Sequence, residues 1–197
     1  MVAKAPGHMH LPLLIALWTG QRQGDLLALR WWAYDGKYIR LTQSKSVSKK
    51  RRRQPVRVVI PVAAPLKAAL DAARVGKGLQ DHILLNSEGK PWTADGFRSS
   101  WRKACAAAGV AGVTFHELRG TAVTRWAIAG CTEVQIAYLT GHSLRDVRSV
   151  LDANYLHRDP ALGESALRHL EKGTNFPNGF PNDLEGSSIV PPKEEEK

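Results

Sequence analysis

The feature that most constrains the fold is a pair of short β-type segments in a chain whose remaining periodicity is helical. Residues 38–42 and 56–60 are rich in β-branched and aromatic side chains, and prolines stand at positions 55 and 61. Because proline cannot donate a ladder hydrogen bond, it favours the ends of a strand over its interior. A strongly basic stretch separates the two segments. The pattern predicts a small antiparallel hairpin with a basic loop.

Apolar residues elsewhere recur every three or four positions, as on one face of a helix. The recurrences are Leu66, Leu70 and Ala73; Phe97, Trp101 and Ala104; and Leu144, Val147, Val150 and Leu151. We predict helices over residues 11–18 and 132–139, a long helix that begins at residue 114 or 115 and runs to 129, and further helices that begin near residues 23, 63, 93, 143 and 160. The predicted fold class is therefore mostly α with a small antiparallel β-sheet.

Composition indicates one domain and a tail. Of the 197 residues 43% are hydrophobic, which is enough for one domain with a core over residues 1–172. Residues 173–197 are turn-rich and then acidic, so we expect a C-terminal tail that is flexible or docks through Phe176 and Phe180. No apolar run reaches ~18 residues and no signal peptide is evident. We expect a cytoplasmic protein in which Cys105 and Cys131 are reduced thiols.

Positive charge is concentrated in the first 170 residues. They contain 25 Lys and Arg against 12 Asp and Glu, a net charge of +13, whereas the rest of the chain carries −3. A basic body of this size favours a polyanionic partner, DNA or RNA first. The charge alone would also fit a basic protein with no such partner.

Side chains suited to phosphodiester chemistry follow one another along the chain. In order they are Arg22, His116, Arg119, His142 and Tyr155. Arginine forks hold phosphate oxygens, imidazoles transfer protons, and a phenol can act as the nucleophile. Each has a simpler explanation alone: Arg22 could be a surface partner of Asp25, and His142 could cap the helix that follows it. Their order is what favours a common site.

The motifs around these residues resemble the catalytic domain of the tyrosine recombinases, the phage integrase family. The resemblance runs from about residue 11 to 170 and rests on TGQRQGDL at 19–26, HELR at 116–119, LTGHS at 139–143 and YLH at 155–157. His142 and Tyr155 are thirteen residues apart, about one helical turn more than is usual in the family. A full turn keeps the tyrosine facing the same way.

The resemblance implies a role for each residue. Tyr155 would attack the scissile phosphate and form a 3′-phosphotyrosyl link. Arg22, Arg119 and His142 would stabilise the phosphoryl oxygens, and His116 would accept the tyrosine proton. Asp25 would support the site from the same helix start as Arg22.

The basic loop has an implied role as well. Lys45, just after the first predicted strand, would protonate the leaving 5′ oxygen, although Lys49 and Lys50 lie close enough in sequence to be confused with it. The run Lys49, Lys50, Arg51, Arg52 and Arg53 would contact DNA phosphates.

The implied function is site-specific recombination of double-stranded DNA, with neither metal nor cofactor. The enzyme would be bacterial or phage-encoded, associated with the nucleoid, and self-associated as a tetrameric synapse, with accessory DNA-bending proteins as candidate partners. The N-terminal core-binding domain usual in the family is absent, so we expect a fragment or a truncated form. Two alternatives stay open: a type IB topoisomerase-like enzyme that relaxes DNA, and a non-catalytic basic DNA-binding protein.

Overall fold

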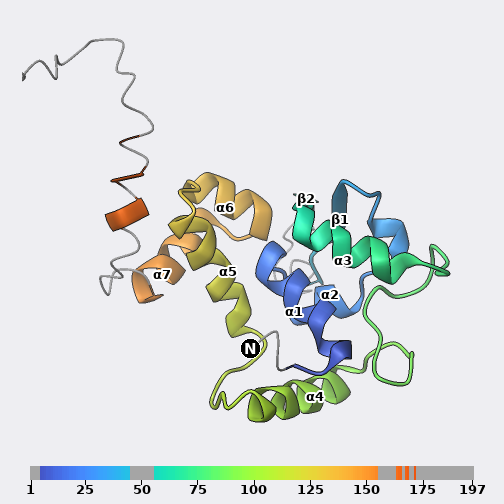
Figure 1. Cartoon of the computed structure of the whole chain (residues 1–197). Helices are drawn as coiled ribbons and strands as arrows, with labels where there is room; N and C mark the ends of the chain where they lie inside the picture. The colour runs from blue at the N-terminus through green and yellow to red at the C-terminus, as the bar shows by residue number, and fades with distance from the viewer. Residues whose placement is uncertain (1–4, 45–55, 155–162, 166, 169–170, 172–197) are drawn as a thin grey trace, which may run out of the picture.

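The computed structural model describes residues 5–44, 56–154, 163–165, 167–168 and 171. Its elements are α1 (Gly7–Thr19), α2 (Gln23–Leu27), the 3-10 helix η2 (Trp31–Ala33), β1 (Tyr38–Thr42), β2 (Arg57–Pro61), α3 (Ala64–Arg74), α4 (Ala94–Ala107), α5 (Glu117–Ile128), α6 (Glu133–Thr140) and α7 (Leu144–Asn154) (Figure 1). The predicted fold class, mostly helical with a small antiparallel sheet, is confirmed.

The two predicted strands pair as expected. β1 and β2 are antiparallel, with Ile39 opposite Ile60 and Leu41 opposite Val58. These four side chains are buried, while the intervening positions of β1 are exposed. Alternation of this kind puts one face of the sheet on the core. The basic loop that joins the strands lies outside the described residues.

Helix α1 lies at the centre of the molecule and contacts α2, α3, α4 and α5 (Figure 1). Met9, Leu13 and Ile15 are almost fully buried on it. The helix ends at Thr19, one residue beyond the predicted end, because Gly20 takes a left-handed φ of 61° and its amide donates to the Ala16 carbonyl. It begins four residues earlier than predicted, since burial of Met9 draws the preceding turn into the core.

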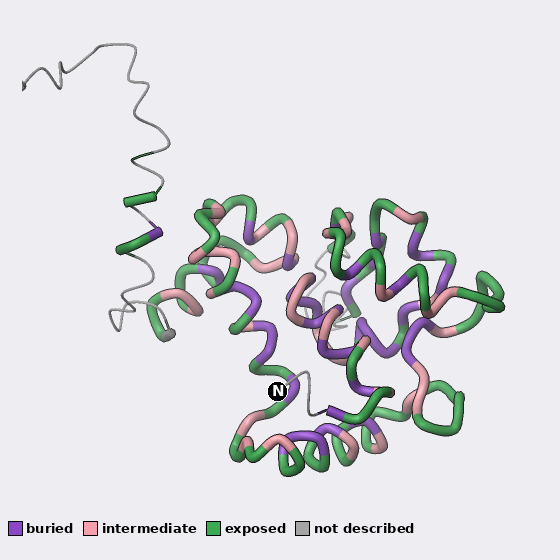
Figure 2. The backbone as a smooth tube through the Cα atoms, viewed as in Figure 1, coloured by how far each residue is buried: buried purple, intermediate pink, exposed green. Residues whose placement is uncertain are grey.

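Buried residues, whose positions along the backbone are coloured purple in Figure 2, form two clusters of unequal size. The large cluster joins α1, the sheet, α3 and α4, and extends to Phe115 and Leu118. The small cluster consists of Val123, Ile136 and Val147, which come from α5, α6 and α7. Helix α5 therefore belongs to both clusters and connects the two parts of the fold.

The start of α5 is fixed by aromatic packing. The Phe115 ring stands edge-on to Phe97 at 4.7 Å and to Trp101 at 5.1 Å. This packing holds residue 115 outside the helix, so that α5 begins at Glu117 with His116 as its N-cap, two or three residues later than predicted. The aromatic packing thereby fixes the positions of His116 and Arg119, which lie at the start of α5.

Cys105 and Cys131 are free thiols, as predicted, and burial raises the pKa of both. Within the described part of the chain, no helix is both long and apolar enough to cross a membrane, and no three His, Cys, Asp or Glu side chains are grouped to hold a metal ion.

Candidate active site

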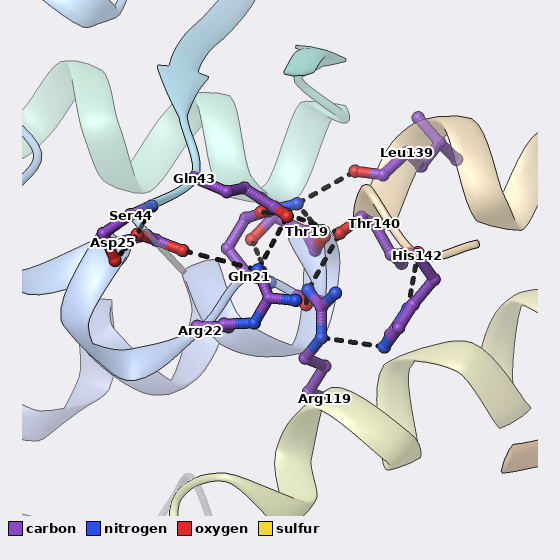
Figure 3. A network of polar contacts seen from close by, with 11 residues as sticks. Thr19, Gln21, Arg22, Asp25, Gln43, Ser44, Arg119, Leu139, Thr140 and His142 are labelled. Atoms are coloured by element: carbon purple, nitrogen blue, oxygen red, sulfur yellow. Dashed lines mark hydrogen bonds and ion pairs between the residues drawn. The ribbon is translucent and has the colours of Figure 1, made fainter. Parts of the chain in front are cut away.

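Arg119 is the buried centre of the site. Only 4% of the residue is exposed, and its Nη1 donates to the carbonyls of Gly20 at 2.5 Å and Thr140 at 2.8 Å (Figure 3). Its Nε donates to Nε2 of His142 at 2.9 Å. The remaining nitrogen, Nη2, is buried and has no hydrogen-bond partner. A guanidinium fixed on one side with a donor left over on the other is arranged to receive an anion.

His142 is held in one tautomer by its neighbours. The Thr140 hydroxyl donates to the Ile136 carbonyl, so its oxygen accepts from Nδ1 of His142 at 2.9 Å. Nε2 then carries no proton and accepts from Arg119. Burial, followed by the charges of Arg119 and Arg22, lowers the pKa of His142 to about 4. The helix cap that follows is Ser143, whose hydroxyl accepts from the Asp146 amide, so His142 is not the cap of α7.

Arg22 lies at the start of α2 and is more accessible than Arg119. A quarter of its side chain is exposed, and its Nη1 donates to Oε1 of Gln43 at 2.7 Å. Its nearest acidic oxygen is Oδ2 of Asp25, 4.0 Å away. Asp25 is itself buried, and its Oδ1 accepts from the amide and hydroxyl of Ser44 at 2.9 and 2.7 Å. Asp25 therefore joins the start of α2 to the end of β1.

Two buried glutamines connect these parts. Gln43 is 1% exposed, and its Nε2 donates to Oε1 of Gln21 and to the Thr140 carbonyl, both at 2.8 Å (Figure 3). Gln21 donates in turn to the carbonyls of Thr19 and Leu139. The amides thus tie the ends of α1, β1 and α6 together behind the arginines.

His116 faces the same pocket from the start of α5. A cavity of about 330 Å³ is lined by His116, Glu117, Arg119, Gly120, Thr121, His142 and Val150. His116 is exposed, unlike the other two site residues in the lining. An exposed imidazole at the mouth of a pocket can exchange protons with a bound group.

The electrostatics of the site are predominantly positive. Burial and the neighbouring Arg22 lower the pKa of Arg119 to about 10, with Asp25 and Asp146 opposing this. His142 is affected in the same direction by Arg119, Arg22 and His116. Positive charge that lowers the pKa values of Arg119 and His142 marks a place where an anion would be stabilised.

The sequence profile of the phage integrase family matches residues 3–161. The chain belongs to the phage integrase family.

Two curated members are distant relatives. The chain is 27% identical over 154 residues to an integrase of Mycobacterium phage FRAT1, with 69% of this chain and 45% of the relative covered. It is 28% identical over 136 residues to a shufflon-specific DNA recombinase of Escherichia coli, with 65% and 30% covered. The chain therefore spans less than half the length of these relatives.

Solved structures have the same fold. XerA recombinase has a TM-score of 0.63 at 22% identity, covering 85% of this chain and 58% of that one. A lambda integrase dimer bound to a COC′ core site has a TM-score of 0.64 at 24% identity, covering 80% and 46%. A lambda integrase tetramer bound to a Holliday junction has a TM-score of 0.57 at 26% identity, covering 72% and 43%. These structures support the predicted tyrosine recombinase catalytic-domain fold.

The fold brings together five of the site residues predicted for this integrase-family chain. Arg22, Asp25, Arg119 and His142 share one hydrogen-bond and charge network, and His116 lines its pocket. Two predicted catalytic residues and the basic run lie outside the described residues: Lys45, Tyr155, Lys49, Lys50, Arg51, Arg52 and Arg53. The tail at residues 173–197 lies outside them as well.

The residues that sequence analysis missed are Gln21, Gln43 and Thr140. All three are polar and nearly fully buried. Their signal in the sequence is weak: Gln21 stands beside Arg22, Gln43 follows a strand, and Thr140 precedes the Gly-His pair. A polar residue at an element end is usually a solvated cap, so only the packed structure identifies these three as buried connectors.

Proposed function

We propose that this chain cuts and rejoins double-stranded DNA in site-specific recombination, through a covalent 3′-phosphotyrosyl intermediate at Tyr155. The observation that carries the proposal is the clustering of Arg22 and His142 around the buried Arg119. Burial and neighbouring positive charge lower the pKa values of Arg119 and His142, and Arg119 retains a buried donor without an acceptor. A phosphodiester would supply an acceptor for this donor and a negative charge beside the two arginines.

The two arginines would stabilise the transition state. As Tyr155 attacks, negative charge accumulates on the non-bridging phosphoryl oxygens. Donors that are already oriented need no reorganisation at that moment, and losing one typically costs ~100- to 1,000-fold in rate. Arg119 is oriented by three hydrogen bonds and Arg22 by one to Gln43.

His142 would change its role when phosphate binds. In the DNA-free protein its Nε2 accepts from Arg119, so it offers phosphate no N–H. A phosphate anion beside the ring favours the protonated imidazole and opposes the depression of its pKa by the arginines. Nε2 would then donate to a phosphoryl oxygen, while Arg119 Nε turns to the same anion.

The proton transfers would use two other residues. His116, exposed at the pocket mouth, would accept the phenol proton of Tyr155. Lys45 would give a proton to the 5′ oxygen as the bond to phosphorus breaks. Because the bond energy is kept in the phosphotyrosyl link, the 5′ hydroxyl of a partner strand can attack it and restore the DNA without ATP.

The partners belong to the same proposal. The solved relatives include a lambda integrase dimer on DNA and a tetramer on a Holliday junction. We propose double-stranded DNA as the substrate, with Lys49 to Arg53 on its phosphates, and self-association on that DNA. Accessory DNA-bending proteins, action in the bacterial cytoplasm and association with the nucleoid are further parts of the proposal.

A trapping experiment tests the proposal. The full chain is incubated with a pool of short duplexes that carry a randomised centre and a nick, so that the cut end diffuses away. We expect a protein–DNA adduct that survives denaturation, and transfer of the joined strand to an added 5′-hydroxyl end from a second duplex. An adduct with relaxation of supercoiled DNA but no transfer between duplexes would favour a topoisomerase-like enzyme. Binding with no adduct would reduce the chain to a DNA-binding protein.

A further inference from the structure

The Gln43 side chain links the two arginines of the site. Its Oε1 accepts from Nη1 of Arg22 at 2.7 Å, and its Nε2 donates to the Thr140 carbonyl at 2.8 Å. That same carbonyl accepts from Nη1 of Arg119 at 2.8 Å. Arg22 and Arg119 are thus joined through one amide and one carbonyl, with no direct hydrogen bond between them (Figure 3).

Only an amide can make this connection. The group must accept from a guanidinium and donate to two oxygens, those of Gln21 and Thr140. A carboxylate accepts but cannot donate, and an ammonium donates but cannot accept. Glutamine at position 43 therefore matches its surroundings by chemistry as well as by size.

The surroundings leave Gln43 little freedom. The residue is 1% exposed, and a Cβ built on Gly141 would lie 2.5 Å from its Nε2. Gly141 has a φ of 66° and ends α6, where the last carbonyls have no partner within the helix. The amide thus packs directly on the backbone at the end of α6 and donates to the Thr140 carbonyl, which has no partner within the helix.

We propose that Gln43 is a positioning residue that sets the placement of Arg22 relative to Arg119. The inference rests on the proposed function, because the phosphate that the two arginines would share is its reason. Arg22 is the less constrained of the pair, since its nearest carboxylate oxygen is 4.0 Å away. A displacement of about 1 Å in a catalytic group can cost ~100-fold in rate, so losing the Gln43 contact would reduce cleavage without removing any group that touches DNA.

The test compares Gln43→Met, which keeps the length and loses every hydrogen bond, with Gln135→Met. Gln135 belongs to the capping box of α6, so its variant removes a hydrogen-bonded glutamine outside the site. We expect Gln43→Met to lower the single-turnover cleavage rate at saturating DNA by about 10- to 100-fold, with a small change in Kd. Gln135→Met should retain the wild-type rate. Unchanged cleavage in Gln43→Met would overturn the inference.

A double-mutant cycle asks whether Gln43 acts through Arg22. In an Arg22→Ala background, Gln43→Met should cause little further loss of rate, because the group that it positions is gone. A full additional loss would contradict the proposal. Gln43→Glu provides a polar variant should Met fail to fold: its carboxylate would pair with Arg22, lose the Thr140 contact, and lower the rate as well. Wild-type cleavage by Gln43→Glu would also contradict it.

One readout does not depend on cleavage. In the DNA-free protein, side-chain ¹⁵N NMR of arginine reports guanidinium rotation. We expect separate Nη resonances for Arg22 in the wild type and averaged ones in Gln43→Met. If wild-type Arg22 were already averaged, Gln43 would not position it, whether or not the chain cleaves DNA. If the resonances behave as expected but no adduct forms, the proposed function fails and the structural link stands.

Discussion

The two arginines of the site come from parts of the molecule that are built differently. Arg22 lies beside the large cluster around α1, is a quarter exposed and has one hydrogen bond to a side chain. Arg119 lies on α5 between the large and the small cluster, is buried, and binds two backbone carbonyls and a histidine. The arginine that lies between the two clusters is therefore fixed by more hydrogen bonds than the one beside the large cluster.

The comparison indicates that Arg119 has a structural role in addition to the catalytic role that we propose for it. Its contacts to Gly20 and Thr140 join the end of α1 to the end of α6. The polar network there lies beside the small cluster, whose fully buried apolar residues among those described are Val123, Ile136 and Val147. Arg22 has no comparable structural role, so substituting Arg22 should lower stability less than substituting Arg119.

Substituting the arginines has the largest expected effect. Arg119→Lys and Arg22→Lys should each slow cleavage at saturating DNA by at least ~100-fold, because lysine cannot reproduce the fork. Only Arg119→Lys should also destabilise the fold, by ~1–3 kcal/mol, since buried carbonyls lose their donor. Cleavage assays and chemical denaturation measure the two effects. Equal stability losses would remove the distinction between the two arginines.

Core truncation compares the clusters directly. Leu70 of α3 and Ile136 of α6 are both fully buried, so each change to Ala should cost ~2–5 kcal/mol of unfolding free energy. We expect Leu70→Ala at the upper end and Ile136→Ala at the lower, because a small cluster relaxes more easily around a cavity. Amide hydrogen exchange should be faster in α6 and α7 than in α1. The reverse order would contradict the unequal packing.

Comparing alanine substitutions at Gly141, which follows α6, and Gly109, which follows α4, separates the steric cost of an added Cβ from the cost of a left-handed backbone. Gly141 and Gly109 have φ values of 66° and 70°, but only at Gly141 would a Cβ collide, 2.5 Å from Gln43 Nε2. Both Ala variants should lose ~1–2 kcal/mol for the left-handed backbone. Gly141→Ala should lose more and should also slow cleavage, whereas Gly109→Ala should cleave normally. Matching stability and activity in the two variants would mean that the amide packing at Gly141 has no consequence.

The smallest expected effect is a pH dependence. The pKa of His142 falls from 6.5 to about 4 on folding, so the unfolded chain binds a proton in this window that the native chain does not. The unfolding free energy should therefore drop as pH falls from about 6.5 towards 4. Above about pH 6.5 His142 is neutral in both states, so its titration should no longer change the unfolding free energy. His142→Gln should show a flatter profile over the same range. The burial of His82 lowers its pKa in both proteins, so the difference between the profiles isolates His142.

Most of this fold was predictable because its signals are local. β-branched residues and flanking prolines indicate the strands, and α1 and α6 end at glycines with left-handed φ. The site was predictable in part because arginine and histidine at motif spacing carry recognisable chemistry. Gln21, Gln43 and Thr140 were not, since their importance comes from contacts made across 97 to 118 residues of sequence. Likewise, the hydrogen bond from Arg119 that makes His142 an acceptor depends on packing, which the motif alone does not encode.

The measurement that tests the central claim most directly is the identity of the residue joined to DNA. The trapped adduct is digested with protease and nuclease, and the modified peptide is sequenced by mass spectrometry. The account predicts a nucleotide on the Tyr155 phenol oxygen, no adduct from Tyr155→Phe, and a normal adduct from Tyr138→Phe, whose tyrosine is exposed on α6 outside the pocket. A full-rate adduct from Tyr155→Phe, or a nucleotide mapped to another residue, would contradict it.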